Sequence, residues 1–170
     1  MKIIYPGSFD PFTKAHLALC IRAASLADEL VVLFAENSQK RAYYSLEERM
    51  RFACTALSNY ANIRIDSWPG LLADYFRESR ADAVLRGLRN TNDLLYEQSM
   101  AEINRLLCPQ LETILLLSRP EESWMSSSLA RELAELGADL SAILPAPVIA
   151  AHARELYKEK RTEPRGGERE

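Results

Sequence analysis

The sequence predicts an α/β fold in which a doubly wound, five-stranded parallel sheet carries helices on both faces. Short apolar runs of strand length alternate five times with longer amphipathic stretches along the chain. The length of 170 residues fits one domain of ordinary size. Hydrophobic residues make up 48% of the chain, which is enough to build a core and argues against disorder.

The first three elements are predicted from hydrophobic spacing. Apolar residues 3–5 predict a buried strand, which ends at a Pro-Gly pair typical of a loop. Over residues 14–27 apolar positions recur at helical spacing, which predicts an amphipathic helix. Residues 30–34 are apolar throughout and predict a second buried strand. The chain therefore begins as a strand, a helix and a strand.

The second helix has a start signal in the sequence. Ser45 is followed three residues later by Glu48, the spacing of a capping box, so a helix should begin there and reach about Leu57. The alternation at residues 63–65 predicts a third strand. Residues 71–76 have the pattern of the middle of a third helix.

The second half of the chain continues the alternation. Residues 83–85 predict a short fourth strand, residues 92–107 a long helix, and residues 114–117 a fifth strand. A helix over residues 126–136 follows a serine cluster, and a last helix over residues 146–158 has a proline near its start. This repeated strand–helix order is typical of the Rossmann-like arrangement.

We assign residues 1–158 to a single domain. Residues 159–170 contain Lys, Arg, Glu and Gly without large apolar side chains, so we expect a charged, flexible tail there.

Composition excludes several classes of function. The formal net charge is -3 with both signs interspersed, which argues against a general nucleic-acid-binding protein. No apolar run approaches the roughly 20 residues of a membrane span, and no signal peptide is evident, so we expect a cytoplasmic location away from membranes. We interpret Cys20, Cys54 and Cys108 as reduced residues in or near the core. With only two histidines and no CxxC pair, no protein-bound metal site is predicted.

In doubly wound sheets ligands bind at the carboxyl ends of the strands, which directs attention to the loops there. The first loop contains Gly7, which would let backbone approach a ligand, and Ser8, which offers a hydroxyl and an amide to a phosphate. Thr13 is placed to cap the following helix, and His16 would lie on its first turn. A helix N-terminus favours anions, so this loop predicts a phosphate site.

Three further loops carry side chains able to contact a phosphate. Lys40 follows the second strand, where the residues alone favour a solvated loop lysine. Arg86, Gly87 and Arg89 follow the fourth strand, and arginine suits bidentate phosphate contact. Three serines at residues 126–128 could wrap a triphosphate, but on the residues alone we interpret them as a helix cap. Glu97 and Asn104, on one face of the long helix, read most simply as an ordinary polar stripe.

The loop sequences resemble a known family. Residues 7–16, GSFDPFTKAH, resemble the GxFDPxTxGH signature of the cytidylyltransferase-like nucleotidyltransferases. Within that superfamily the closest resemblance is to bacterial phosphopantetheine adenylyltransferases. It rests on Lys40, SLEER at 45–49, GLL at 70–72, RGLR at 86–89 with Asp93, Tyr96 and Glu97 after it, and SSS at 126–128.

This resemblance implies transfer of an adenylyl group from ATP to 4'-phosphopantetheine, which gives dephospho-CoA and pyrophosphate in coenzyme A biosynthesis, with Mg²⁺ accompanying ATP. It also implies a homo-hexamer and CoA as an inhibitor. The implied catalytic residues are His16, Lys40 and Arg89, and the implied acceptor-binding residues are Ser8, Lys40, Leu72 and Arg86. The implied ATP-binding residues are Ser8, Phe9, His16, Gly87, Leu88, Arg89, Glu97, Glu122, Ser123, Trp124, Met125, Ser126, Ser127 and Ser128.

Two departures from the family pattern leave alternatives open. The signature glycine is Ala15 here, and the aromatic residue usual near position 122 is Glu122, for which Trp124 would compensate. One alternative is a nucleotidyltransferase of the same superfamily with another acceptor, such as nicotinamide mononucleotide or a cytidylyl acceptor. The other is a nucleotide- or CoA-binding protein whose catalysis Ala15 has weakened.

Overall fold

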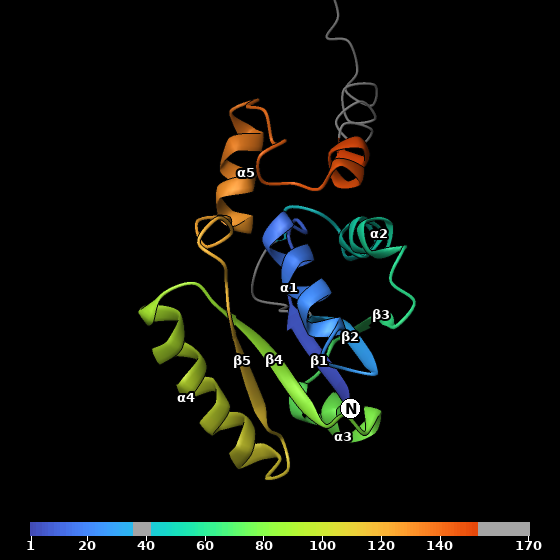
Figure 1. The fold of residues 1–170 in the computed structure, drawn as a ribbon, viewed down its shortest axis with the longest axis vertical. Helices are drawn as coiled ribbons and strands as arrows, with labels where there is room; N and C mark the ends of the chain where they lie inside the picture. The colour runs from blue at the N-terminus through green and yellow to red at the C-terminus, as the bar shows by residue number, and fades with distance from the viewer. Residues whose placement is uncertain (36–41, 153–170) are drawn as a thin grey trace, which may run out of the picture.

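A computed structural model describes residues 1–35 and 42–152 of the chain. It contains one sheet and five principal helices in that part of the chain (Figure 1). The strands are β1 (Lys2–Gly7), β2 (Glu29–Ala35), β3 (Ile63–Trp68), β4 (Ala83–Leu88) and β5 (Thr113–Leu117). The helices are α1 (Lys14–Ala24), α2 (Leu46–Leu57), α3 (Leu72–Ser79), α4 (Thr91–Leu107) and α5 (Ser127–Glu135).

The five strands are all parallel and lie in the order β3-β2-β1-β4-β5. The chain winds outward from β1 in one direction through β2 and β3, and then in the other through β4 and β5. The order therefore reverses between β1 and β4, and a crevice is expected beyond the carboxyl ends of these two strands. The predicted Rossmann-like, doubly wound sheet is confirmed.

Alternate residues of each central strand point to opposite faces of the sheet, and each face has its own core. Ile3 and Tyr5 belong to a cluster that includes residues of α1, α2 and α5. Ile4, between them in β1, packs instead with Ala73 and Phe76 of α3. Helices thus cover both faces, which explains why residues 3–6 of β1 and 30–34 of β2 are buried consecutively rather than alternately.

Three predicted helix starts are confirmed by their caps: Thr13 is the N-cap of α1, and the other two caps are those of α2 and α5. Ser45 Oγ accepts a hydrogen bond from Glu48 N at 3.2 Å, and Glu48 Oε2 accepts one from Ser45 N at 2.7 Å, which completes the capping box. Ser126 Oγ accepts from Leu129 N at 3.1 Å, so the first serine of the cluster is the N-cap of α5.

Several predicted boundaries change. Pro6 and Gly7, expected in a loop, pair with residues 33 and 34 of β2 and complete β1, and β3 extends beyond residue 65 to Trp68. The fourth strand does not end at residue 85, because Arg86, Gly87 and Leu88 continue to pair with residues 115–117 of β5. These residues, assigned to a loop from the sequence, are the last half of β4. Of the last predicted helix, residues 146–152 are helical and the remainder lies outside the described residues.

The cysteine interpretation holds for two of the three residues. Cys20 and Cys108 are buried, but Cys54 is exposed, because it falls on the outer side of α2. All three are free thiols. Within the described ranges, no helix is both long and apolar enough to cross a membrane.

Candidate active site

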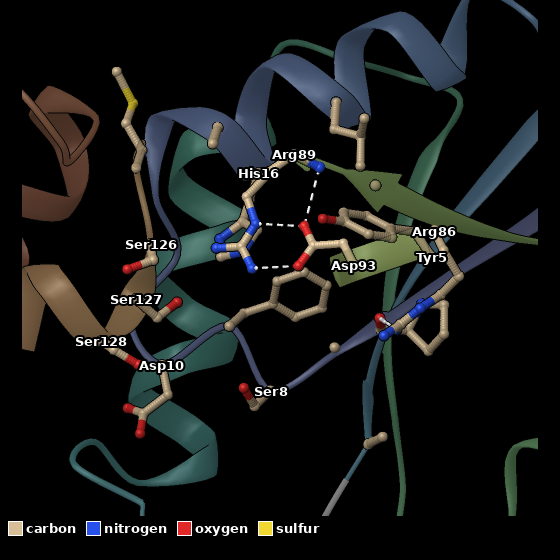
Figure 2. A pocket seen from close by; sticks show the side chains of 18 of the residues that line it. Tyr5, Ser8, Asp10, His16, Arg86, Arg89, Asp93, Ser126, Ser127 and Ser128 are labelled. Atoms are coloured by element: carbon tan, nitrogen blue, oxygen red, sulfur yellow. Dashed lines mark hydrogen bonds and ion pairs between the residues drawn. The ribbon is translucent and has the colours of Figure 1, made fainter. Parts of the chain in front are cut away.

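A pocket of about 810 Å³ opens at the carboxyl ends of β1 and β4, where the strand order reverses (Figure 2). Its lining comes from the ends of β1, β2 and β4 and from the starts of α1, α2, α4 and α5, with parts of the adjoining loops. The lining residues include Tyr5, Gly7, Ser8, Phe9, Asp10, Ala15, His16, Arg49, Arg86, Gly87, Arg89, Asp93, Tyr96, Glu97, Met125, Ser126, Ser127, Ser128 and Arg131.

Phe9 shapes the floor of the pocket. Its backbone has φ of 46°, in the left-handed region that favours glycine, and its side chain is only 2% exposed. A Cβ on Gly7 would lie 2.7 Å from the Phe9 ring, so Gly7 is needed to admit that ring. The sequence suggested that Gly7 lets a ligand approach, but the group that the structure places against it is Phe9.

The start of α1 holds His16 in a defined orientation. Thr13 is the N-cap, and its Oγ1 accepts from His16 N at 3.4 Å. In return, Thr13 N–H donates to His16 Nδ1 at 3.0 Å. A backbone N–H can only donate, so Nδ1 is the acceptor and the proton of the neutral imidazole lies on Nε2. Nε2 has no hydrogen-bond partner among the described residues, which leaves its N–H available to a ligand.

Burial, together with the nearby Arg89 guanidinium, lowers the pKa of His16 to about 4. Aromatic rings contribute to this burial, because Phe9 and Phe12 lie 5.1 and 5.6 Å from the imidazole centroid. At neutral pH the group is therefore a neutral hydrogen-bond donor and not a cation.

This low pKa predicts a pH-dependent stability. In the unfolded chain His16 becomes protonated below its pKa of about 6.5. In the folded protein the imidazole stays neutral until the pH approaches its lowered pKa of about 4. The contribution of His16 to stability is thus complete above about pH 6.5 and is lost as the pH falls toward 4. Urea unfolding at about pH 7.5 and about pH 5 measures this loss. Between the two pH values the free energy of unfolding should fall less in His16→Gln than in the unsubstituted protein. Equal losses would contradict the prediction.

Arg86 and Glu97 form a bidentate pair at the side of the pocket. Arg86 Nε and Nη2 each donate to a Glu97 carboxylate oxygen at 2.7 Å, and Arg86 Nη1 donates to the carbonyl of Pro6 at 2.8 Å. Glu97 is 7% exposed and is the buried residue of α4. The helical spacing of Glu97 had suggested a solvated polar stripe, and this interpretation is wrong for Glu97 because its side chain is buried in an ion pair.

Arg89 lies at the same mouth of the pocket but is held by a different carboxylate. Its Nε donates to Asp93 Oδ2 at 2.9 Å and its Nη2 to Asp93 Oδ1 at 3.1 Å. The hydrogen bonds from Arg89 lower the pKa of Asp93, so this carboxylate is ionised at neutral pH. Figure 2 shows His16, Arg89 and Asp93 grouped on the side of the pocket opposite Ser8.

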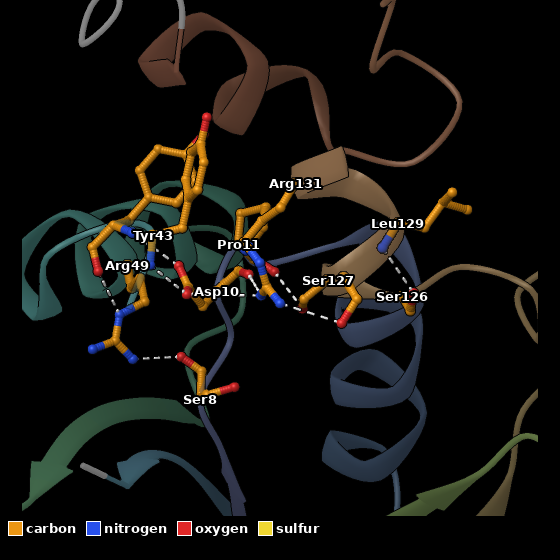
Figure 3. A network of polar contacts seen from close by, with 11 residues as sticks. Ser8, Asp10, Pro11, Tyr43, Arg49, Ser126, Ser127, Leu129 and Arg131 are labelled. Carbon is orange, nitrogen blue, oxygen red and sulfur yellow. Dashed lines mark hydrogen bonds and ion pairs between the residues drawn. The ribbon is translucent and has the colours of Figure 1, made fainter. Parts of the chain in front are cut away.

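A second polar network joins the first loop to α5 (Figure 3). Arg131 Nη1 donates to the Asp10 carbonyl at 2.6 Å and lies 3.7 Å from the Asp10 carboxylate. The same carboxylate accepts from Tyr43 N at 2.8 Å and from Tyr44 N at 3.0 Å. Ser127 Oγ donates to the Pro11 carbonyl at 2.9 Å. These bonds fix the serine cluster beside the first loop.

The structure brings most of the predicted residues together and leaves some apart. Eleven of the predicted positions line the pocket, namely Ser8, Phe9, His16, Arg86, Gly87, Arg89, Glu97, Met125, Ser126, Ser127 and Ser128. Lys40 lies outside the described residues. Leu72, Leu88, Glu122, Ser123 and Trp124 do not line this pocket, and Trp124 is 51% exposed.

Sequence reasoning gave no role to four charged residues of the lining: Asp10, Arg49, Asp93 and Arg131. Asp10 lies inside the quoted loop and Arg49 inside the SLEER segment, but nothing in their spacing distinguishes them from solvated side chains. Arg131 lies three residues after the serine cluster, one turn into α5, and that helical spacing is a signal that could have found it.

Comparison with known proteins agrees with this geometry. The cytidylyltransferase-like family model matches residues 4–133. A phosphopantetheine adenylyltransferase of Shouchella clausii (strain KSM-K16) is 41% identical over 158 residues, which cover 92% of this chain and 98% of the relative. The protein of that name from Thioalkalivibrio sulfidiphilus (strain HL-EbGR7) is 43% identical over 148 residues, 87% of this chain and 93% of the relative. The chain belongs to the phosphopantetheine adenylyltransferase family.

Membership in this family confirms the resemblance predicted from the loops. The matched span begins in β1 and ends in α5, so it contains every element that lines the pocket. Ala15, which replaces the signature glycine of the family, lies within that span and contributes to the lining on the first turn of α1.

Proposed function

We propose that this chain transfers the adenylyl group of ATP to the phosphate of 4'-phosphopantetheine, which gives dephospho-CoA and pyrophosphate in coenzyme A biosynthesis. The observation that carries the proposal is the pocket itself: four arginines, the donor His16 and a serine-capped helix start converge at the point where the sheet order reverses. The names of relatives that share about 40% of their residues with this chain support the choice of substrates.

The chemistry needs no general base. An oxygen of the acceptor phosphate, already an anion at neutral pH, forms a bond to the α-phosphorus of ATP. The bond from that phosphorus to the bridging oxygen breaks, and pyrophosphate leaves. The barrier lies in bringing two anions together and in stabilising charge on the transferring oxygens. His16 suits this role because its neutral Nε2–H donates a hydrogen bond without any change in protonation.

Other lining residues take roles that follow from their positions. Ser8 lines the pocket, its carbonyl accepts a hydrogen bond from Arg49, and it is the proposed contact shared by both substrates. Arg89 would contact the triphosphate, and Ser127 and Ser128 at the start of α5 would contact its β- and γ-phosphates through hydroxyl and backbone N–H groups. Arg86 would hold the acceptor phosphate together with Lys40, which lies outside the described residues.

We propose that Mg²⁺ enters as its complex with ATP and is held by phosphate oxygens. Among the side chains of residues 1–35 and 42–152, no group of three or more His, Cys, Asp or Glu is arranged to hold a metal ion. When bound, the ion neutralises part of the triphosphate charge, which complements the arginine-rich lining.

The decisive experiment measures pyrophosphate release from ATP and Mg²⁺ with phosphopantetheine, and with nicotinamide mononucleotide as the competing acceptor. We expect pyrophosphate release when phosphopantetheine is the acceptor and none with nicotinamide mononucleotide. Preference for nicotinamide mononucleotide would favour a nucleotidyltransferase of the same superfamily with another acceptor. Binding of ATP or CoA without pyrophosphate release would favour a protein whose catalysis Ala15 has weakened.

We also propose that the chain assembles into a homo-hexamer through α4 and β5. These neighbouring elements lie at one side of the molecule (Figure 1). Their outer surface presents a row of large apolar side chains without cover from the described residues, an arrangement typical of a subunit interface. The row consists of Leu94, Leu95, Ile103, Leu106, Leu107, Leu115 and Leu117, with exposed fractions from 38% to 83%.

Disruption of this row should dissociate the assembly. Leu106 is 83% exposed at the end of α4, so Leu106→Glu should place a charge in the interface and shift the protein toward smaller species. Leu136→Glu is the matched control, because Leu136 is 75% exposed beyond α5 and away from the row. Light scattering coupled to size exclusion measures both masses. Unchanged mass in both variants would place the interface elsewhere.

CoA contains the phosphopantetheine moiety, so we expect it to compete with the acceptor for this pocket and to inhibit. The cytoplasm is our proposed location, and the free state of Cys20, Cys54 and Cys108 is consistent with a reducing compartment.

A further inference from the structure

The four arginines that line the pocket differ in how their charge is balanced. Arg86 pairs with Glu97, and Arg89 pairs with Asp93. Arg131 lies 3.7 Å from Asp10. Arg49 is the fourth, and no carboxylate within the described part of the chain lies within ion-pair distance of it.

Arg49 is also the most buried of these arginines, at 6% exposed. It belongs to the first turn of α2, and two backbone carbonyls hold its guanidinium: Nε donates to the Tyr44 carbonyl at 3.1 Å and Nη1 donates to the Ser8 carbonyl at 2.7 Å. Nη2 makes no hydrogen bond to a described residue, although the residue lines the pocket. Figure 3 shows the guanidinium directed at Ser8.

A buried charge that lacks a counter-charge is costly, and proteins retain one where a ligand supplies the opposite charge. Carbonyl oxygens solvate a guanidinium but do not neutralise it. The two carbonyl bonds fix the plane of the group, so the remaining N–H groups of Nη2 are oriented before any ligand arrives. An anion bound beside Ser8 would complete the coordination of Arg49.

We propose that Arg49 binds the phosphate of the acceptor substrate. This inference rests on the proposed function. It adds to that site a phosphate-binding residue that the sequence motifs did not indicate. The acceptor is favoured over ATP because Arg49 approaches the Ser8–Pro11 segment from the side of α2, whereas the serines and Arg131 of α5 lie on its other side (Figure 3). In this arrangement the phosphomonoester of phosphopantetheine contacts Arg49, and the triphosphate of ATP contacts the start of α5.

The test compares the affinities for 4'-phosphopantetheine and for pantetheine, the same molecule without its phosphate, by calorimetry on the full chain. In the unsubstituted protein the phosphate should strengthen binding. Arg49→Met, which retains the aliphatic stem, should weaken binding of phosphopantetheine roughly 10- to 100-fold and leave pantetheine binding and ATP binding nearly unchanged. Arg49→Lys, which keeps the charge without the planar fork, should retain part of the discrimination.

Arg51→Met is the matched control, since Arg51 is an exposed residue of the same helix. A purely structural role for Arg49 would weaken binding of both acceptor forms and of ATP together, and this outcome would overturn the proposal. Loss confined to ATP would overturn it as well, because it would place the triphosphate at Arg49. If Arg49→Met fails to fold, Arg49→Lys still decides the matter through the ratio of the two acceptor affinities. Turnover of phosphopantetheine by the unsubstituted protein tests the proposed function separately. If the unsubstituted protein turns over phosphopantetheine and Arg49→Met still prefers phosphopantetheine to pantetheine as strongly, only the role of Arg49 is rejected.

Discussion

His16→Ala should reduce adenylyl transfer roughly 100- to 1,000-fold while the protein remains folded, the scale seen when a hydrogen-bond donor to a developing charge is removed. The donor is Nε2–H, because Thr13 N–H occupies Nδ1 at 3.0 Å. The loss should appear mainly in kcat, since the bond strengthens as charge develops on the α-phosphate. Steady-state pyrophosphate release with both substrates varied measures it.

Thr13→Ala provides the control for His16→Ala. Both substitutions remove half of the capping box of α1, and each should cost about 1 kcal/mol of stability. Thr13→Ala retains the backbone N–H that orients the imidazole, so its activity should fall far less than that of His16→Ala. Comparable activity losses in the two variants would mean that the helix cap, and not the Nε2 donor, is what transfer requires.

The parts of this fold that could be predicted from sequence are those set by local interactions. The capping box of Ser45 and Glu48 and the N-cap of Ser126 depend on residues three apart, so their spacing indicates them directly. The parallel sheet followed from the repeated order of strands and helices. The same order placed the first loop and the start of α5 at one end of the sheet, where both line the pocket.

The features that could not be predicted depend on partners distant in sequence. The length of β4 is set by pairing with β5, a neighbour nearly 30 residues away, so Arg86 was assigned to a loop. Asp10 and Arg131 are 121 residues apart, and no local pattern connects them. The role of Gly7 depends on the ring of Phe9, whose left-handed backbone the sequence does not indicate. Which pocket arginines have a carboxylate partner likewise depends on the three-dimensional positions of the side chains, and the sequence does not give these.

Glu97→Ala should be the most destabilising of the site substitutions, because it removes one partner of a largely buried ion pair. The side chains of Arg86 and Glu97 are 29% and 9% exposed, and their two hydrogen bonds are each 2.7 Å long. Loss of one member of such a pair costs roughly 3 kcal/mol, since the remaining charge loses its partner. Denaturant unfolding measures the change, and the KM for the acceptor should rise as Arg86 loses its orientation.

The matched control is Glu102→Ala, which removes an exposed carboxylate from the same helix and should leave both stability and KM nearly unchanged. A double-mutant cycle with Arg86→Met separates the pair from its surroundings. Each single substitution leaves a buried charge unpartnered and the double substitution leaves none, so the double variant should lose less stability than the sum of the two. Additive losses would show that the two residues act independently, and Arg86 would then owe its orientation to the Pro6 carbonyl alone. If Arg86→Met by itself raises the acceptor KM as much as the double variant does, Glu97 serves the acceptor by positioning Arg86, and no direct contact between Glu97 and ATP is needed to account for its burial.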